Sequence, residues 1–532
     1  TGVERRIELG NTIATIGDVN TRVEQRLITN MSDLLIAKTP GVSLLPGNNT
    51  GAPPVIRIRG LNSLSLNNAP IFVIDGVRMN SSPIGSGATF AATSNLTSLN
   101  PQEIEDIEIV KGPSAATLYG TDAANGVIVI TTKRGRAGAT RWAWHAEGAT
   151  IKDRADYLPA YALLGHTATA PSVRCLLIQV AAKTCTVDST SSLNVMNTPR
   201  LSPLDVGNRL QYGMQVSGGS DAVRYFVSAD LENETGPYKM PGFSVARLDS
   251  LKVKMQEEWL HPEHLGKQNF RVNISAALSP KFDLTATAGF AKVSQRVPGA
   301  NNGFFSVQYQ SMTGPGFEGP GPGYSAKGQL GEDLHGYNGY VPSEMNQILT
   351  QQDIQRMIGS FDASWRPFTW MHNTGTVGID LSNRMDLTLC HYGECPVQGT
   401  QRQGRSIVAH TNDRNVSAKL MSILAGRPRP WADLKSTIGA DYINIEADAS
   451  AATGNILPPG ASRPQDGAIP SVSGTLATAT KTLGMYVQEQ LGVNDRLFLT
   501  AAVRSDQNSA FGTNFQSVLY PKLSASYVIS DE

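Results

Sequence analysis

The feature that most limits how this chain can fold is a series of alternating segments from Arg141 to the end of the sequence. Apolar and polar residues alternate there with a period of two, in segments of about ten residues separated by turns, which indicates β-strands with two unlike faces. Three hairpins are predicted from this pattern, each closed by a short Gly, Ser, Pro, Asn or Asp turn. They pair residues 209–217 with 223–231, 270–278 with 282–290, and 483–491 with 497–503.

The composition restricts how such strands could be used in a membrane. The chain is 40% hydrophobic and 17% charged, but no stretch approaches the ~18–20 consecutive apolar residues of a membrane helix. A closed β-barrel is then the one membrane structure open to it, because backbone polar groups in lipid must all be paired. A water-soluble sandwich would show the same alternation. Loop lengths favour the barrel, since the opposite turns are tight and three connections are long: 151–208, 295–352 and 448–475.

The N-terminal region has a different pattern. Short β-branched runs bounded by Gly, Pro, Asn or Asp predict strands near residues 55–60, 71–76, 104–111 and 126–133. A short helix is expected over residues 113–124, with Pro113 near its first position. Residues 19–38 place apolar side chains on one helical face, and Thr39-Pro40-Gly41 ends that helix.

Four blocks of this region carry a family resemblance: IRIRG, PIFVIDGV, NPQEIEDIEIVKGPSAATLYG and GVIVITTKRG. The series resembles the plug domain of TonB-dependent outer-membrane transporters, in particular the SusC/RagA-like branch. The resemblance is dense over residues 31–135 and returns in residues 485–490 and 517–530. It implies a membrane all-β barrel with an N-terminal α+β plug domain inside. Residues 1–138 are then the plug domain, and residues 139–532 are the N-terminal part of the transmembrane β-barrel with long extracellular loops.

The resemblance implies a barrel of about 22 strands, whereas the alternation gives about 14 antiparallel strands. We therefore expect the barrel to be incomplete in this chain, because an unpaired strand edge at mid-membrane is not viable. No signal peptide is visible, and Thr1 starts within a pattern, so the sequence is interpreted as a processed or trimmed piece.

Family resemblance also supplies the expected function. It implies TonB-dependent active import of a large nutrient, an oligosaccharide or a peptide, across the outer membrane of a Gram-negative-type bacterium, with the plug gating the barrel. The implied partners are TonB, acting through a segment just before Thr1, a SusD-like surface lipoprotein, the ligand and outer-membrane lipid. Two alternatives remain open: a TonB-linked receptor and signal transducer with an extra domain before Thr1, and a non-transporting glycan-binding surface β-protein.

Other functional classes find little support in the sequence. The formal net charge is zero, so a nucleic-acid partner is not indicated. The chain contains no H-E-x-x-H, no Gly-x-Ser-x-Gly and no clustered His, Asp and Glu set, so no enzyme, cofactor or metal site is predicted. Gly314–Gly328 has glycine spacing like a phosphate loop, but three prolines interrupt it, and we interpret it as an extracellular loop. Residues 114–117 could hold an anion, although a plain helix start is the preferred interpretation.

Charged residues of the plug are the first candidate site, because a charge enclosed by a barrel wall needs a partner. The candidates are Arg57, Arg59, Glu103, Glu105, Glu108 and Lys111. We expect plug–barrel polar contacts in which Arg59 and Lys111 face the inner wall and Glu489 is one partner. The family more often has Arg where Lys111 stands.

Two plug loops rich in Asn and Ser form the second candidate site. By resemblance they lie at the top of the plug, where amides and hydroxyls could bind sugar hydroxyls or peptide amides; the alternative is that they only form turns. The substrate-contact candidates are Asn62, Ser63, Ser65, Asn67, Asn68, Arg78, Asn80 and Ser81.

The four cysteines fall into two local pairs, Cys175 with Cys185 and Cys390 with Cys395, both in turn-rich segments. An oxidising compartment would convert them into two short disulfides, which we favour over free thiols or a metal site.

Overall fold

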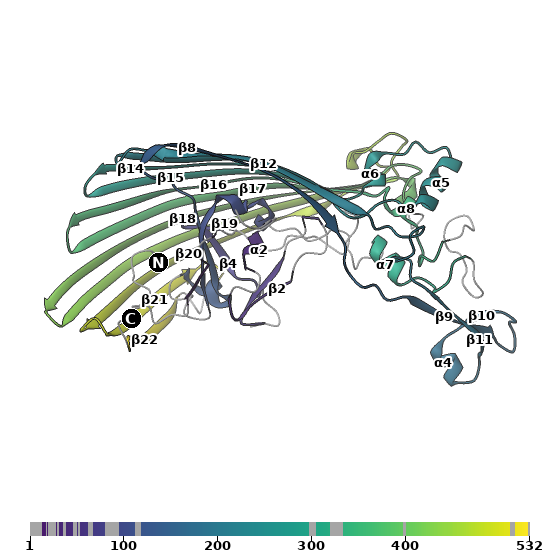
Figure 1. Ribbon diagram of the computed structural model, residues 1–532, viewed down its shortest axis with the longest axis horizontal. Helices are drawn as coiled ribbons and strands as arrows, with labels where there is room; N and C mark the ends of the chain where they lie inside the picture. The colour runs from purple at the N-terminus through teal and green to yellow at the C-terminus, as the bar shows by residue number, and fades with distance from the viewer. Residues whose placement is uncertain are drawn as a thin grey trace.

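The largest part of the structure is one long, curved antiparallel sheet, with a small α+β unit on its concave side (Figure 1). The structure is a computed structural model. It describes residues 13–16, 19, 28, 31–35, 39–45, 50–51, 54–61, 68–79, 95–111, 119–296, 305–319, 334–396, 401–510 and 517–529. The curved sheet is called the wall below, and the unit formed by the residues before it is called the plug.

The wall contains 12 strands, each paired with its sequence neighbour in the sheet, and β8 and β22 lie at its two edges. All three hairpins predicted from the sequence are present, as β12–β13, β14–β15 and β20–β21. The strands are β8 (Gly138–Lys152), β12 (Val206–Gly219), β13 (Val223–Thr235), β14 (His264–Ser279), β15 (Phe282–Arg296), β16 (Leu349–Phe368), β17 (Met371–Cys390), β18 (Arg405–Arg429), β19 (Ala432–Asn455), β20 (Ile469–Val493), β21 (Leu497–Asn508) and β22 (Val518–Tyr527).

The two faces of the wall have opposite polarity. Along β16, Arg356 and Ser360 point inward and are buried, whereas Met357, Phe361 and Trp365 alternate with them and are 50%, 64% and 50% exposed on the outside. A soluble sandwich buries its apolar face instead. An apolar outside and a polar inside is the arrangement of a transmembrane β-barrel.

One long connection was predicted wrongly. Residues 448–475 were expected to form a loop, but β19 continues to Asn455 and β20 begins at Ile469. Both strands exceed the roughly 9–11 residues that cross a bilayer, so they continue beyond the membrane as a paired ribbon. Small and polar residues in this stretch hide the apolar alternation on which the sequence prediction depends.

The plug is built on a five-stranded sheet in the order β1-β6-β7-β4-β5. Its strands are β1 (Ile13–Ile16), β4 (Ile71–Ile74), β5 (Val77–Met79), β6 (Ile104–Val110) and β7 (Val127–Thr132). Parallel pairing of β4 with β7 and antiparallel pairing of β6 with β7 place three of the predicted strands side by side. The fourth, β3 (Val55–Ile58), pairs instead with β2 (Val42–Leu45) in a separate hairpin.

The predicted plug helices are described only in part. Helix α2 covers Met31–Leu35, and Met31, Leu34 and Leu35 are buried in the plug core, as the apolar face predicted. The rest of residues 19–38, apart from Val19 and Ile28, lies outside the described residues. So do residues 113–118 of the second expected helix, and its end is the 3-10 helix η5 (Thr121–Asn125). Two further 3-10 turns, η2 (Asn95–Ser98) and η3 (Pro101–Glu103), precede β6.

The described parts of the long connections form a layer beyond one end of the wall (Figure 1). One apolar cluster centres on Tyr337, which is fully buried, and another centres on Trp259. The layer contains α5 (Gly242–Ser250), α6 (Glu257–Leu260), α7 (Val307–Met312), α8 (Pro342–Met345), η7 (Gln401–Gln403) and η8 (Pro464–Asp466). No helix among the described residues is long and apolar enough to cross a membrane.

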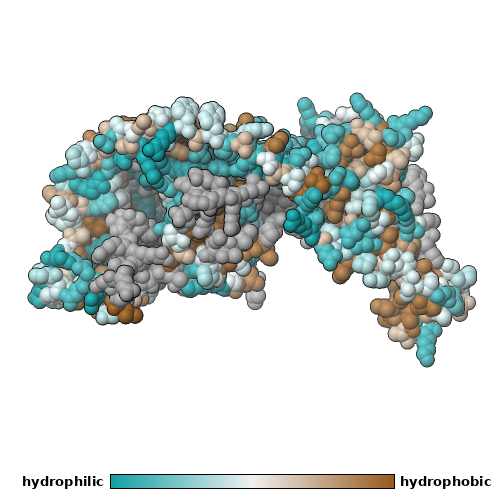
Figure 2. Space-filling model, viewed as in Figure 1, coloured by the Kyte–Doolittle hydropathy of each residue, from teal (hydrophilic) through white to brown (hydrophobic). Residues whose placement is uncertain are grey.

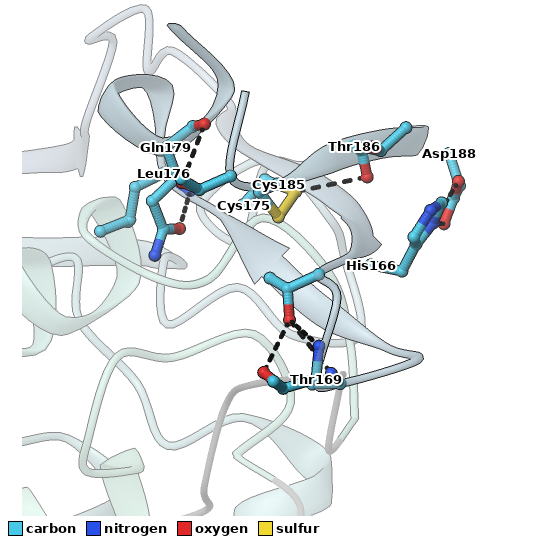
Figure 3. The surroundings of a disulfide bond; sticks show 11 residues. His166, Thr169, Cys175, Leu176, Gln179, Cys185, Thr186 and Asp188 are labelled. Atoms are coloured by element: carbon cyan, nitrogen blue, oxygen red, sulfur yellow. Dashed lines mark hydrogen bonds and ion pairs between the residues drawn. A yellow bond between two sulfur atoms is a disulfide. The ribbon is translucent and has the colours of Figure 1, made fainter. Parts of the chain in front are cut away.

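An arm extends from this layer. It consists of β9 (Ala160–His166), β10 (Val173–Cys175), β11 (Thr186–Leu193) and the short helix α4 (Leu177–Ala181). The Cys175–Cys185 disulfide links β10 to the start of β11 with Cα atoms 5.7 Å apart (Figure 3). Figure 2 shows apolar surface at the tip of the arm, where Leu177 and Ile178 are 78% and 75% exposed.

Candidate functional site

The surface where the plug meets the inside of the wall is the candidate functional site. Its centre is Arg271 on β14, whose Nε lies 2.7 Å from Glu103 Oε2 and whose Nη1 lies 3.6 Å from Asp75 Oδ2. Ser228 Oγ on β13 donates to Glu103 Oε1 at 3.1 Å. All four side chains are buried, so one wall cation pairs with two plug carboxylates out of contact with water.

Local structure explains how these charges come together. Asp75 and Gly76 form the two-residue turn between β4 and β5, with φ of 46° and 82°. Two successive positive φ values are typical of a type I′ hairpin turn, which favours Asp-Gly. Thr132 on β7 then fixes the Asp75 carboxylate by donating from its backbone N at 3.0 Å and from its hydroxyl at 2.7 Å.

On the wall side, a glycine provides the space for the guanidinium. Gly289 on β15 is paired with Arg271, and a Cβ there would lie 2.9 Å from Arg271 Nη2. Asn273, two residues further along β14, donates to Thr132 Oγ1 at 2.9 Å and to Lys133 O at 2.7 Å. Each plug group in this part of the interface is therefore held by a side chain of β13 or β14.

Further polar contacts extend the interface along the wall. Arg356 on β16 pairs with Asp380 on β17 at 2.7 Å, and its Nη1 donates to Ser98 Oγ of the plug at 3.1 Å. Asn269 Nδ2 donates to Ser98 O at 3.1 Å. Gln102 of the plug donates to Glu147 on β8 at 3.1 Å. The η2 and η3 turns are thus attached to several strands by neutral and charge-assisted bonds.

A second charged region of the wall lies beside the opposite part of the plug. Arg504 on β21 pairs with Asp441 on β19 at 2.6 Å and with Asp506 at 2.7 Å. Gly120 of the plug approaches this group so closely that a Cβ would lie 3.1 Å from Asp506 Oδ2. The Tyr119 ring next to it has Lys419 Nζ 5.7 Å from its centroid. Here the wall charges pair with one another, and the plug contributes backbone and an aromatic face.

Apolar contact between plug and wall is concentrated at β5. Strand β5 packs against β16, β17 and β18, and Val77 faces Gly378 of β17. A Cβ on Gly378 would lie 2.3 Å from Val77 Cγ2. Polar contacts predominate elsewhere, and such contacts can be replaced by water when the plug moves.

The predicted role of Glu489 is wrong. Strand β20 points Gln488 and Gln490 into the wall's interior, so Glu489 between them lies on the outer face, where it is exposed. Its carboxylate accepts a hydrogen bond from Ser436 Oγ on β19 at 2.7 Å. A one-residue difference in position decides the side of a strand, and the sequence resemblance around residues 485–490 did not fix that side.

Lys111 and Arg59 are also placed differently from the prediction. Lys111 is buried within the plug, and its Nζ donates to Pro40 O at 2.8 Å. Burial, together with the nearby charge of Arg59, lowers the pKa of Lys111. Arg59 itself follows β3 with a φ of 59° and is exposed. The two cations are therefore neighbours of one another rather than partners of Glu489, and Glu103 is the predicted plug charge that the structure places at the interface.

Most of the predicted substrate contacts fall outside the described residues: Asn62, Ser63, Ser65, Asn67, Asn80 and Ser81. Asn68 lies just before β4 and is half-buried. Arg78 lies within β5, paired with Val73, and not in a loop as predicted. Both cysteine pairs are disulfides, as predicted, with Cys390 and Cys395 having Cα atoms 5.8 Å apart.

A wall that is polar inside and apolar outside, with a plug attached within it by buried charges, defines a plugged outer-membrane β-barrel. Comparison with protein families agrees: residues 16–127 match the TonB-dependent receptor plug domain, and residues 269–532 match the TonB-dependent receptor-like β-barrel. The chain belongs to the TonB-dependent receptors, a non-enzymatic family of outer-membrane proteins in Gram-negative bacteria.

Individual relatives and solved structures similar to this chain include SusC and RagAB. The TonB-dependent receptor SusC of Bacteroides thetaiotaomicron is 41% identical over 113 residues, which are 21% of this chain and 11% of SusC. The TonB-dependent receptor P26 of Formosa agariphila is 27% identical over 286 residues, 52% of this chain and 26% of P26. Among solved structures, the RagAB peptide importer in its open-open state is similar with a TM-score of 0.69 at 16% identity, covering 98% of this chain and 57% of that chain. The chain thus spans little more than half of the solved relative's length and a smaller part of the curated relatives.

Proposed function

We propose that the protein to which this chain belongs imports a large nutrient across the outer membrane, with the plug as a gate opened by TonB. The observation that carries the proposal is the buried contact of Arg271 with Glu103 and Asp75. A gating plug has to stay seated until a force is applied to it. Buried polar contacts suit this role, because they are strong while water is excluded from them. Removing one partner of such a buried ion pair costs about 3–5 kcal/mol, because the other charge is left unpaired.

The substrate class in this proposal is an oligosaccharide or a peptide. The similar RagAB structure is described as a peptide importer, and SusC is described as a TonB-dependent receptor. The Asn- and Ser-rich plug loops, with Asn68 and Arg78, are proposed to contact the substrate, because amides and hydroxyls suit both sugar hydroxyls and peptide amides. A SusD-like surface lipoprotein is proposed as the partner above the loop layer, and TonB as the partner on the opposite side.

A covalent lock between plug and wall tests the gating. Val77 Cβ lies 3.2 Å from the ideal Cβ position of Gly378, close to the roughly 3.5–4.5 Å of a disulfide. No free cysteine is present among the described residues, so Val77→Cys with Gly378→Cys adds one defined bridge. Uptake of labelled oligosaccharides and peptides would be measured in cells expressing the full-length protein, with and without TonB.

The gating proposal predicts that the oxidised double variant binds ligand at the cell surface but does not import it, and that mild reduction restores uptake. Each single-cysteine variant, treated with the same reductant, controls for effects on the native disulfides. Import through the locked protein, or import that persists in cells lacking TonB, would contradict the proposal. Binding without import by the unlocked protein, with altered gene expression, would instead indicate a signal transducer.

A further inference from the structure

Glu263 carries a buried carboxyl group that is not part of the plug–wall contacts around Arg271, Arg356 and Arg504. It lies between α6 and β14, beneath the loop layer, and its residue is 1% exposed. Neither of its carboxyl oxygens has a hydrogen-bond partner of good geometry among the described residues, although the backbone N–H groups of Thr50 and Tyr238 face it. A carboxylate in such a place is costly unless its charge is compensated.

Glu263 adjoins the point at which the plug reaches the loop layer. A Cβ on Gly236 would lie 2.0 Å from Glu263 Oε2 and 2.5 Å from Thr50 Oγ1, so these three groups converge. Gln295 on β15 holds the same part of the plug, because its Nε2 donates to Thr50 O at 3.1 Å. A Cβ on Gly51 would lie 2.7 Å from Gln295 Oε1. Thr50–Gly51 is therefore tightly enclosed by the wall and Glu263.

The charges that act on Glu263 are mainly negative. Glu234 at the end of β13 and Asp153 after β8 both oppose its ionisation, and burial has the largest effect, so the pKa of Glu263 is raised to about 8. The Tyr238 hydroxyl also lies close enough to interact with Glu263. Two cations, Lys267 and Arg209, lie in this region, but their charges act to lower the pKa of Glu234. Both also form ion pairs with Glu232, which lies on β13 with Glu234.

No group of three or more His, Cys, Asp and Glu side chains in the described part of the chain is arranged to hold a metal ion, so these side chains do not point to a metal as the compensating charge. A proton on Glu263 remains as the simplest compensation, and a neutral carboxyl can stay buried beside Glu234 and Thr50.

We propose that Glu263, next to Glu234, is a proton-operated latch on the plug: the protonated carboxyl keeps Thr50–Gly51 seated against the wall, and loss of the proton loosens that segment. The latch would regulate the gate of the proposed importer. Its regulatory role rests on that proposed function, whereas its effect on the position of the plug does not. Protons outside the cell would thereby set how firmly the plug is held at its outward end.

The direction of the pH dependence follows from the raised pKa. When Thr50–Gly51 leaves, water reaches Glu263 and its pKa returns toward the ordinary value of 4.5. The seated state therefore binds the proton more tightly, and seating is strongest below pH 4.5. Seating weakens as the pH rises from 4.5 to about 8 and does not weaken further above that pH. Within this range the equilibrium constant for seating changes by at most about tenfold per pH unit.

The test follows the position of the plug directly, without transport. Spin labels are attached at Ser43→Cys on β2 and Ala246→Cys on α5, both exposed positions, in the full-length protein in detergent. Distances between them are measured by pulsed electron paramagnetic resonance from pH 4.5 to 9. The long-distance, unseated population is expected to grow as pH rises. In Glu263→Gln, which cannot ionise, it should stay constant at its low value.

Two further variants make the result specific. Glu258→Gln in α6, whose carboxyl is 47% exposed and 3.8 Å from Arg296, should keep the wild-type pH dependence. Glu234→Gln removes the neighbouring charge and should move the transition to lower pH, which gives an independent measurement if Glu263→Gln does not fold. Wild-type distances that do not change with pH, or a transition that is unaltered in Glu263→Gln or Glu234→Gln, would overturn the latch. Neither outcome would bear on import, which the Val77–Gly378 lock tests separately.

Discussion

Arg271 of the wall and Glu103 of the plug are joined across the interface at 2.7 Å, and their side chains are only 5% and 6% exposed. They lie 168 residues apart in the chain, so the pair forms only when the plug is seated. The contact combines charge, burial and a fixed guanidinium geometry, which makes it a sensitive indicator of plug position.

Removing the cation of this pair should loosen the plug more than any surface substitution. In Arg271→Met, Glu103 and Asp75 would remain buried together without their counter-charge, and we expect the free energy of plug opening to fall by about 3–5 kcal/mol. Native-state hydrogen exchange of the β6 and β7 amides measures this quantity directly.

Arg414→Gln is the matched control for Arg271→Met. Arg414 pairs with Glu446 at 3.2 Å, but its side chain is 59% exposed, so its loss should change plug opening by less than about 1 kcal/mol. Equal effects of the two substitutions would show that burial of the Arg271 pair does not hold the plug.

Close packing at β5 gives a second prediction. Gly378→Ala would place its Cβ 2.3 Å from Val77 Cγ2, and overpacking of this kind destabilises by about 1–3 kcal/mol. Val77→Ala in the same protein removes the obstructing methyl groups and should restore part of the lost stability. Hydrogen exchange of the β4–β5 turn measures both variants. Additive losses in the double variant would mean that the two side chains do not meet.

The sequence was sufficient for the architecture but not for the interface. Alternation identified hairpins such as β14–β15 because one face of each strand is consistently apolar. Glu103 could be suspected from its charge within the plug, but its partner could not, because Arg271 is distant in the sequence and several wall strands carry inward arginines. Glu489 was misplaced for a related reason: sequence spacing alone does not say which of two alternating residues faces inward.

Glu263 escaped the sequence interpretation altogether. It stands in a short linker between α6 and β14 with no pattern around it, and its burial results from contacts with Gly236 and the plug. The usable signal would have been Gly236, a glycine just after a strand, which often marks a close backbone approach.

The disulfide of the arm should stabilise the arm alone. A closed loop of about ten residues contributes roughly 3 kcal/mol through the entropy of the unfolded chain. We expect Cys175→Ser with Cys185→Ser to increase proteolytic cleavage within β9–β11 and α4, with unchanged hydrogen exchange in the plug. Cys390→Ser with Cys395→Ser, in the β17–β18 connection, is the control that removes a disulfide from another loop. Altered exchange in β6 or β7 on loss of the arm disulfide would show that the arm and the plug are coupled.

Glu489 provides the last prediction, because its hydrogen bond is with Ser436 of the wall and none of the described plug residues bonds to it. Glu489→Gln changes a carboxyl on the outer face of β20 that accepts from Ser436, so plug opening measured by exchange of the β6 amides should remain within about 0.5 kcal/mol of wild type. Glu103→Gln makes the same chemical change at the interface and would leave Arg271 paired with Asp75 at 3.6 Å; a loss of about 1.5–3 kcal/mol, the net value of a hydrogen bond to a charged group, is expected there. If Glu489→Gln weakened the plug as much as Glu103→Gln, the outward orientation of Glu489 would be untenable, and the register of β20 against β19 would have to shift by one residue.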